Sequence, residues 1–420
     1  MEEAQRKEID ELISKPGRQP EAYRILKEYQ GAKDVWYHRS MFICSFYAGA
    51  QADGRFSIDK LMFSNSPCSE EGHRNYNWYV VTLPSQRIEF SYEFKCHLFD
   101  VREPGNPVQV IYFPANPSVV RTDEGYLVNV RFVNYLVAEG LYPSTSPNRM
   151  VKTINSQLRL DKDFKQISYL DVDDTNREKH ICFITGIEDV RLKPGSNHVD
   201  GKFIGTVCDY KSDWNNMPRM IIGERTNSKV TSSMIPAVPH LNRCEKNWSF
   251  IEDDDRILYG FEMQYNPENP QQLETYVVLV HPESDLFRTT KVKQTTFFNG
   301  SFLRGSTPLI KFNHNGHNGY LTVFHHVAVD ANIDNPKLRR YYHRLAIFDL
   351  NFQVTHMSHA FQIENIRIQY IPGICISHNQ KDLIISLSLE DRTAHLRTVP
   401  IDFITNSSFM KPIGQMSSLE

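Results

Sequence analysis

Residues 318–323 read Asn-Gly-Tyr-Leu-Thr-Val, a polar turn followed by a short strand of apolar and β-branched residues. The same arrangement of turn and strand occurs at five places, at 122–128, 200–204, 253–259, 318–323 and 379–385. Turn-linked strands that recur in this way are typical of radially repeated β structure. The sequence therefore predicts a mainly β protein, a five-bladed β-propeller with insertions, with an array of β-sandwiches as the structural alternative.

The segments before and after the repeated region differ from it in sequence pattern. The first segment, 1–65, reads as helical, with expected helices at 2–13, 20–29, 34–50 and 57–63. We expect a small N-terminal α-helical cap, either a tetratricopeptide-like pair or a generic cap on the larger domain. The other expected parts are a polar linker, the propeller and a polar tail, at 66–85, 86–404 and 405–420.

The composition is that of an ordinary globular protein. The 420 residues carry a net charge of −3, so no overall basic field favours nucleic acid as a partner. No apolar run approaches the roughly 18 residues that span a bilayer, and the charged first ten residues do not resemble a secretory signal. The seven cysteines are scattered, which predicts reduced thiols and a cytoplasmic location.

Residues 186–192 read Gly-Ile-Glu-Asp-Val-Arg-Leu and place two adjacent carboxylates and an arginine within an apolar run. Charges buried between apolar neighbours cost several kcal/mol unless they are paired or used. One interpretation is a structural salt bridge between Asp189 and Arg191, and the other is a catalytic carboxylate. The choice depends on whether the other repeats carry polar residues at matching places.

Every repeat does carry a polar cluster near its strands. The inner strands of a propeller converge on one axial funnel, so side chains at equivalent positions would meet in a single site. A mixture of acids, cations and amides suits a ligand rich in hydroxyl groups, such as a sugar. The candidate site residues are Asn116, Arg131, Asn134, Glu188, Asp189, Arg191, Glu245, Lys246, Asn247, Arg304, His325, His343, Arg344, Glu364 and Asp391.

Several of these positions also have structural interpretations. Strand alternation points His325 and His326 to opposite faces, so at most one of them faces a site. Trp248 is either a core residue or a platform for a sugar ring, and the run with His343 and Arg344 also fits a solvated strand. No spacing of His, Cys, Asp and Glu indicates a metal site, and no cofactor is expected.

The motifs also form an ordered set. In chain order they are Asn-Pro-Ser (116–118), Gly-Ile-Glu-Asp-Val-Arg (186–191), Glu-Lys-Asn-Trp (245–248), Arg-Gly-Ser-x-Pro (304–308), Gly-Tyr-Leu-x-x-x-His (319–325), Glu364 and Leu-Glu-Asp (389–391). Over residues 110–400 this set resembles the five-bladed β-propellers of glycoside hydrolase family 130, the β-mannoside phosphorylases, and related β-1,2-mannosyltransferases. The forms at 129–135 and 244–248 resemble propeller domains attached to tetratricopeptide and glycosyltransferase proteins.

The resemblance implies roles for individual residues. Asp189 would be the general acid that protonates the leaving oxygen while phosphate attacks the sugar from the opposite face. Glu188 and Arg191 would orient this carboxylate, and the other candidates would line the funnel and bind hydroxyl groups.

One motif departs from the phosphorylase pattern. The phosphorylases carry a His-Arg pair after the Lys-Asn element, whereas 258–262 reads Leu-Tyr-Gly-Phe-Glu without a cation. Lys246, Arg304 and the pair at 343–344 would then supply cations for a phosphate or diphosphate.

These observations lead to two functional hypotheses. The first is an inverting carbohydrate-active enzyme that transfers a hexose, with mannose as the candidate, from a nucleotide sugar or sugar phosphate to a glycan acceptor. The second is a non-catalytic carbohydrate-binding or scaffold propeller that partners a glycosyltransferase through its helical cap.

Overall fold

The computed structural model describes residues 3–14, 19–28, 80–88, 97–103, 106–135, 144–146, 150–180, 182–195, 201–211, 217–239, 244–329 and 339–415. The chain divides into two compact units, Met1–His73 and Arg74–Glu420. Within the described residues, no helix is long and apolar enough to cross a membrane.

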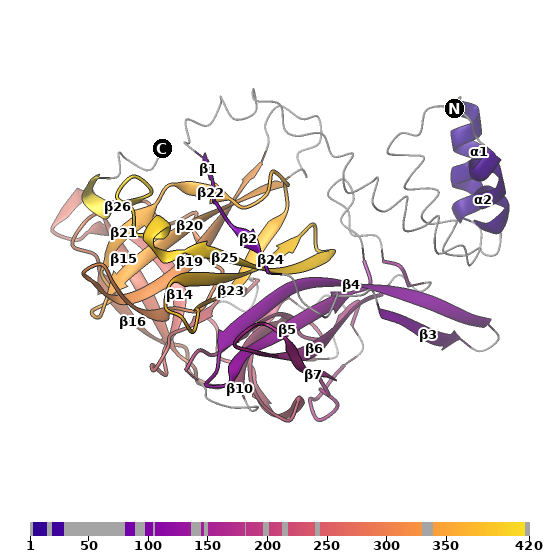
Figure 1. Ribbon diagram of the computed structural model, residues 1–420, viewed down its shortest axis with the longest axis horizontal. Coiled ribbons are helices and arrows are strands. Elements are labelled where there is room, and N and C mark those ends of the chain that lie inside the picture. Colours follow the sequence, from indigo (N-terminus) through magenta and orange to yellow (C-terminus); the bar gives the residue numbers. More distant parts are fainter. Residues whose placement is uncertain are drawn as a thin grey trace. The chain divides into compact units, whose positions relative to one another are not determined.

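The first unit contributes two described helices, α1 (Glu3–Ser14) and α2 (Gln19–Glu28), which contact each other (Figure 1). Each helix buries apolar residues at helical spacing, Ile9 and Leu12 on α1 and Ala22 and Leu26 on α2. The helices predicted at 34–50 and 57–63 lie outside the described residues. The helical cap as a whole therefore stays a prediction.

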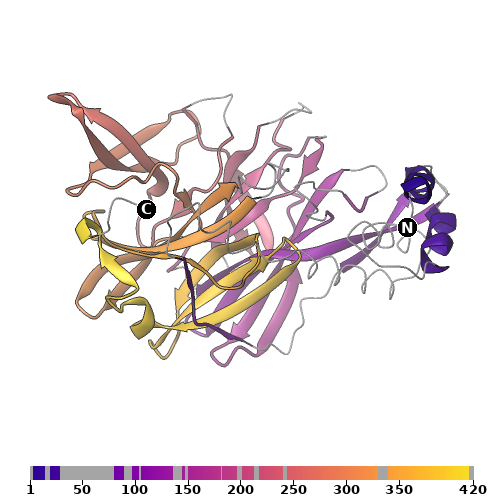
Figure 2. The same ribbon diagram turned by 90° about the horizontal axis from the view of Figure 1, so that it is seen from above.

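The second unit confirms the prediction of a mainly β protein (Figure 2). Its described strands form five sheets, numbered here in chain order. The first sheet runs β3-β4-β5-β6-β7, and β8 pairs with β6. Its strands are β3 (His97–Glu103), β4 (Asn106–Arg121), β5 (Gly125–Val133), β6 (Val151–Asp161), β7 (Gln166–Asp171) and β8 (Ile184–Thr185).

The second and third sheets are antiparallel and have four strands each. The second consists of β9 (Glu188–Leu192), β10 (Gly201–Val207), β11 (Arg219–Thr226) and β12 (Lys229–Met234). The third consists of β13 (Ser249–Phe250), β14 (Ile257–Asn266), β15 (Asn269–His281) and β16 (Arg288–Lys293).

The fourth and fifth sheets recruit strands from both ends of the unit. The fourth contains β17 (Arg304–Gly305), β18 (Ile310–His314), β19 (His317–Val329), β20 (Arg339–Asp349), β21 (Val354–Ser358), β22 (Ala360–Gln362), β1 (Val80–Thr82) and β26 (Met410–Pro412). The fifth contains β23 (Gln369–Ile376), β24 (Asp382–Leu389), β25 (Thr393–Pro400) and β2 (Gln86–Arg87), and α6 (Ile401–Ile404) and the 3₁₀ turn η1 (Ile413–Gln415) complete the chain.

The five repeated turn-and-strand segments each lead into or overlap a strand of a different sheet, namely β5, β10, β14, β19 and β24. One turn lies earlier than predicted, because Asn315 and Gly316 form it and residues 318–319 already belong to β19. Both turn residues have positive φ angles, 49° and 80°, which a two-residue hairpin loop requires.

Apolar clusters fill the space between neighbouring sheets. One joins β4 and β5 to β9 and β10, a second joins β10 and β11 to β13–β15, and a third joins β14 and β15 to β19 and β20. A fourth joins β18–β20 to β23 and β24, and a fifth returns from β23–β25 to β4–β6. Each sheet therefore packs against the next, and the fifth packs against the first.

Strands from several different sheets also lie close together. Strand β4 contacts β9 and β23, and β9 contacts β13 and β23. A Cβ added at Gly373 of β23 would lie 2.5 Å from the backbone nitrogen of Val119 on β4, so glycine is required for this approach. Polar groups on these strands are therefore brought near one another.

The segments predicted as linker and tail differ from that expectation at their apolar residues. Strand β1 lies within 66–85 and pairs in parallel with β22, and Leu83 is buried beside it. Strand β26 lies within 405–420 and pairs with β21, and Phe409 and Met410 are buried. A few apolar side chains anchor each segment, although most of its neighbours along the chain are polar.

Candidate functional site

Arg131 on β5 is the centre of a polar cluster that residues from several sheets form. The cluster comprises Asn116, Arg131, Tyr135, Glu188, Asp189, Lys246 and Asp391, and is called the Arg131 cluster below. The Arg131 guanidinium is buried and donates hydrogen bonds of 2.7 Å to both Glu188 and Asp189. Its Nε donates to Thr153 Oγ1 at 3.3 Å, which fixes the plane of the guanidinium. Charge-assisted bonds of this length are the strong ones in proteins.

Asp189 is held as an anion. Its Oδ1 accepts from Arg131 and, at 2.7 Å, from the Asn116 amide. Burial alone would raise the pKa of this carboxyl, but the charges of Arg131 and Lys246 outweigh burial and lower the pKa to about 2. Asp189 therefore forms its salt bridge with Arg131 on another sheet and not with Arg191, the pairing that the structural interpretation of the motif required.

Lys246 adds a second cation to the cluster. Its Nζ lies 3.5 Å from Glu188, and 35% of its side chain is exposed. Burial acts to lower the pKa of Lys246, but Glu188 and Asp189 raise it, so the ammonium stays charged. A long ion pair and partial exposure leave this cation accessible to a ligand.

Asp391 lies on the other side of Arg131, in the turn between β24 and β25. Its Oδ2 accepts a hydrogen bond of 3.1 Å from the Tyr135 hydroxyl, and Tyr135 in turn accepts from Arg131 at 3.4 Å. Burial raises the pKa of Asp391, and the charge of Arg131 opposes this only in part. The site thus contains one carboxyl with a lowered pKa and one with a raised pKa.

Backbone strain marks the same place. Asn116, Asp189, Asn247 and Asp391 have positive φ angles of 42°, 49°, 69° and 51°, a region that L-residues seldom adopt. The four positions belong to or adjoin β4, β9, β13 and β24, in four different sheets. Such residues cost about 1–3 kcal/mol each and gather at functional sites. Their convergence is an indication of function that does not depend on any sequence motif.

β-bulges help to create these conformations. The pairing of β4 with β5 shifts register between Ala115 and Ser118, at the strained Asn116. The pairing of β10 with β9 shifts between Ile204 and Thr206, opposite the Glu188–Leu192 strand. A bulge re-aims a side chain out of the ordinary strand alternation, and here the bulges accompany the residues that reach Arg131.

A second group of contacts surrounds Arg191, which is fully buried. Its guanidinium donates to the Ser306 carbonyl at 2.5 Å and the Trp248 carbonyl at 3.3 Å. It also donates to Asn247 Oδ1 at 3.1 Å and to the Tyr370 hydroxyl. Arg191 therefore connects residues of four sheets through its hydrogen bonds.

The two adjacent histidines face different surroundings, as strand alternation predicts. His325 Nδ1 lies 2.7 Å from Ser306 Oγ, and its ring lies 5.2 Å from that of Tyr370, next to the Arg191 contacts. The ring of His326 instead packs against Tyr342 and Phe302. Only His325 adjoins the candidate site.

Some predicted site residues have other contacts. Asn134 braces a loop, because its amide donates to the Met150 carbonyl and accepts from Lys152. Glu245 accepts from the Trp248 indole, and Glu364 pairs with Arg397. None of these three contacts includes a member of the Arg131 cluster.

The remaining predicted residues lie on the fourth sheet. Arg304 is exposed on β17, where it pairs with His325 through the backbone. His343 and Arg344 are buried on β20, so they do not form the solvated charge run that was the alternative. Arg344 donates to the Ser358 carbonyl at 3.0 Å. Trp248 is also fully buried, which makes it a core residue and not a platform for a sugar ring.

Buried polar side chains bind the backbone of the loop just before Asp189. Asp209 is buried, pairs with Arg177 through two bonds of 2.8 Å, and accepts the Gly186 N–H at 3.0 Å. On the other side, the Asn155 amide donates to the Ile187 carbonyl at 2.8 Å. The loop is thus fixed at two successive residues.

Sequence reasoning missed Tyr135, Tyr370, Asp209 and Asn155. Tyr135 directly follows Asn134 in the same motif. The sequence predicts Asn134 as the site residue, but the contacts of Asn134 brace a loop. The other three act through contacts between sheets, and no local pattern in the sequence marks them.

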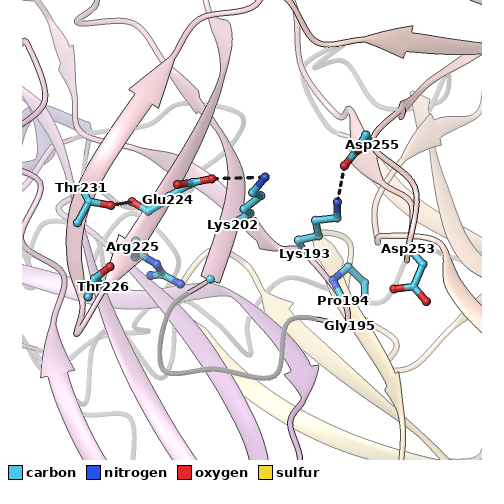
Figure 3. Close-up of a pocket in the computed structure, with 11 residues that line it drawn as sticks. Lys193, Pro194, Gly195, Lys202, Glu224, Arg225, Thr226, Thr231, Asp253 and Asp255 are labelled. Carbon is cyan, nitrogen blue, oxygen red and sulfur yellow. Dashed lines mark hydrogen bonds and ion pairs between the residues drawn. The ribbon is translucent and has the colours of Figure 1, made fainter.

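A hollow of about 630 Å³ between the second and third sheets is a separate feature (Figure 3). Two ion pairs line it, Lys193 with Asp255 and Lys202 with Glu224, each at 3.4 Å. It includes no residue of the Arg131 cluster. In the part of the chain that the structure describes, no group of three or more His, Cys, Asp or Glu residues could hold a metal ion.

Comparison with known proteins gives similar folds but no sequence family. No family model matches the sequence, and no curated protein matches it. Solved structures with a similar fold include a glycosyl hydrolase from Bacteroides ovatus (11% identity, 79% of this chain and 97% of that chain, TM-score 0.46). Others are a β-1,2-mannobiose phosphorylase from Listeria innocua (12%, 70% and 91%, 0.43) and a mannose phosphorylase from Leishmania mexicana (11%, 80% and 92%, 0.41). At these identities and scores the function has to be argued from the site itself.

Proposed function

We propose that this protein is a carbohydrate-active enzyme that transfers a hexose, with mannose as the candidate, from a phosphate-activated donor to a hydroxyl acceptor with inversion. The observation that carries the proposal is a cluster of three residues with positive φ angles around one buried guanidinium: Asp189 bonds Arg131, Asn116 bonds Asp189, and Asp391 reaches Arg131 through Tyr135. They come from three sheets, and a fold stores strain at such a point when the geometry of the side chains matters.

The charges in the site suit glycosyl transfer. The transition state carries positive charge at the anomeric carbon, and a carboxylate beside that carbon stabilises it. Asp189 is such a carboxylate, because the pKa of about 2 keeps it ionised at neutral pH. Asp391, the Asn116 amide and the Tyr135 hydroxyl add hydrogen-bonding groups for sugar hydroxyls.

Lys246 is the cation best placed for the phosphate of the donor. It is partly exposed, and its ammonium remains charged beside Glu188. Arg304 is exposed on the neighbouring fourth sheet and is a second candidate. His343 and Arg344 are removed from this role, because both are buried within β20.

The five sheets support a five-bladed β-propeller as the architecture that carries this site. Each sheet packs on the next through an apolar cluster, and the fifth sheet packs on the first. Strand β2 precedes the first sheet in the chain but pairs with β25 of the fifth, as expected where a ring of blades is closed. In this proposal the Arg131 cluster occupies one end of the axial funnel.

A non-catalytic carbohydrate-binding protein is the second candidate, and one feature favours it. At the place where the phosphorylase pattern has cations, Tyr259 packs between Trp248 and Phe287 with ring centroids 5.4 and 5.7 Å apart. An aromatic cluster at this place supplies no charge for a phosphate. Helices α1 and α2 would then serve to bind a partner glycosyltransferase.

Donor screening separates the two candidates. The purified full chain is incubated with mannose 1-phosphate or GDP-mannose and mannose as acceptor, and the disaccharide product is measured. The proposed enzyme forms product from at least one donor, and Asp189→Asn reduces the rate by about 10³-fold or more. A matched control, Asp255→Asn, changes an exposed carboxylate outside the Arg131 cluster and leaves the rate unaltered. Full turnover by Asp189→Asn would contradict the assignment, and sugar binding without turnover by the wild type would favour the second candidate.

A further inference from the structure

We infer that Asp391, held by Tyr135, transfers the proton in this reaction, while Asp189 remains an anion beside the migrating sugar. This inference rests on the proposed function and divides its chemistry between two carboxylates.

Asp391 is connected to the centre of the site through one hydroxyl group. Arg131 donates to the Tyr135 oxygen, and the Tyr135 hydroxyl donates to Asp391 Oδ2 at 3.1 Å. Within the described contacts, Asp391 Oδ1 accepts no hydrogen bond from the protein, and in the proposed step this oxygen takes the proton of a substrate hydroxyl. Asp391 lies with Glu390 in the hairpin turn between β24 and β25, where both residues have positive φ angles, 51° and 52°.

The two aspartates have different partners and therefore different protonation. Asp189 bonds a guanidinium directly, and a carboxyl with a pKa of about 2 neither donates a proton at neutral pH nor attracts one from an alcohol. Among the described residues, Asp391 bonds the neutral Tyr135 phenol, and burial raises its pKa above the ordinary value. Carboxyl groups whose environments push their pKa values apart take different roles in acid–base catalysis.

Three other carboxylates have hydrogen-bond or ion-pair partners of their own. Glu188 is shared between Arg131 and Lys246. Burial also raises the pKa of Glu390 and Glu252, but the first accepts the backbone N–H of Ile368 and the second that of Lys311. In the described part of the chain, Asp391 is the carboxyl that combines a raised pKa with a hydrogen-bonded path to Arg131.

The proposed step is balanced without a cofactor. The O–H bond of the acceptor breaks, and its proton passes to the carboxylate of Asp391. The acceptor oxygen forms a bond to the anomeric carbon from one face, while the bond from that carbon to the donor phosphate breaks on the other face. The phosphate leaves with the electron pair of the broken bond, and Asp189 faces the positive charge that develops on the sugar. In the reverse direction Asp391 returns the proton to the leaving oxygen.

Azide provides the sharpest test, because it attacks the anomeric carbon without losing a proton. Asp391→Asn is assayed with the donor that the wild type uses, mannose 1-phosphate or GDP-mannose, and with mannose or azide as acceptor. We expect transfer to mannose to fall by about 10²–10⁴-fold, and transfer to azide to stay within about threefold of the wild type. Asp189→Asn loses both reactions, and Asp255→Asn loses neither. Equal loss of both reactions in Asp391→Asn, or loss of neither, would overturn the inference.

A second measurement does not depend on turnover. Carboxyl-carbon NMR of the ¹³C-labelled full chain, without substrate, follows each aspartate during a pH titration. We expect an aspartate that titrates above the ordinary range, and we expect Asp391→Asn to remove that signal. Retention of the signal in the variant overturns the inference. A wild type that uses neither donor overturns the proposed function instead, so the two failures are distinguishable.

Discussion

The sequence predicts most residues of the Arg131 cluster and the pair His343 and Arg344 on β20 as parts of one site. In the structure, the charged groups of these two regions have different surroundings. In the cluster, cations and carboxylates from several sheets pair with each other over distances near 2.7 Å. On β20, burial lowers the pKa of His343 to about 3, and the pKa of Arg344 to about 10, and neither residue forms an ion pair within the described structure. The first region keeps its charges by pairing them, whereas the second region buries polar groups within one sheet.

The difference shows what separates a functional site from a polar core. A buried charge is tolerated when partners converge on it, and convergence here requires strained residues from different sheets. His343 and Arg344 form no ion pair within the described structure, and neither has a positive φ angle. The comparison can be tested by removing a comparable group from each region.

The largest expected difference concerns the two arginines. Arg131→Met leaves Glu188 and Asp189 buried without their cation, which we expect to lower the free energy of unfolding by about 3–5 kcal/mol. Arg344→Met removes one hydrogen bond to a carbonyl and should cost about 1 kcal/mol. Urea unfolding of both variants measures the losses. Equal losses of unfolding free energy would show that the ion pairs of Arg131 stabilise the protein no more than the single hydrogen bond of Arg344 does.

A smaller effect is expected in the loop that positions Asp189. Gly186 has a φ angle of 95°, and an added Cβ would lie 2.1 Å from the Thr153 carbonyl oxygen. Gly186→Ala should therefore cost about 1–3 kcal/mol and reduce turnover, because the Asp209 contact to this backbone is disturbed. Gly316 offers a matched control, since its φ angle is 80° but an added Cβ there meets nothing within 4 Å. If thermal unfolding shows the same loss for Gly316→Ala, strain alone and not the crowded loop explains the effect.

The smallest effect concerns pH. His343 is neutral when folded, because burial lowers its pKa from 6.5 to about 3, so the unfolded chain binds a proton that the folded chain does not. Stability should fall as the pH is lowered from about 6.5, by up to about 1.4 kcal/mol per pH unit for this group. Asp189 behaves differently, since its stabilisation is complete above its ordinary pKa of 3.8 and is lost only as the pH falls toward 2.

The variant His343→Leu isolates this contribution. Urea midpoints at about pH 7.5 and about pH 5 should differ less for His343→Leu than for the wild type, because one titrating group is gone. Asp255→Asn should leave the difference unchanged. An unchanged pH dependence in His343→Leu would show that the buried histidine is not neutral in the folded protein.

The sequence allowed the sheets and part of the site to be predicted. The turn-and-strand repeats lead to one strand in each of the five sheets, because a polar turn followed by β-branched residues is a local signal. The motifs also located Arg131, Asp189 and Asp391. They did not show that Asp189 pairs with Arg131 in place of Arg191, because that choice depends on a bulge in β4 and on packing between sheets.

The central claim is that side chains from four sheets form one sugar site around Arg131. The most direct test is a crystal structure of the full chain carrying Asp189→Asn, soaked with mannose 1-phosphate. We expect a bound sugar that contacts Asn116, Lys246 and Asp391, with its phosphate on the Lys246 side. Ligand bound elsewhere, such as in the hollow between the second and third sheets, with an empty Arg131 cluster, would contradict it.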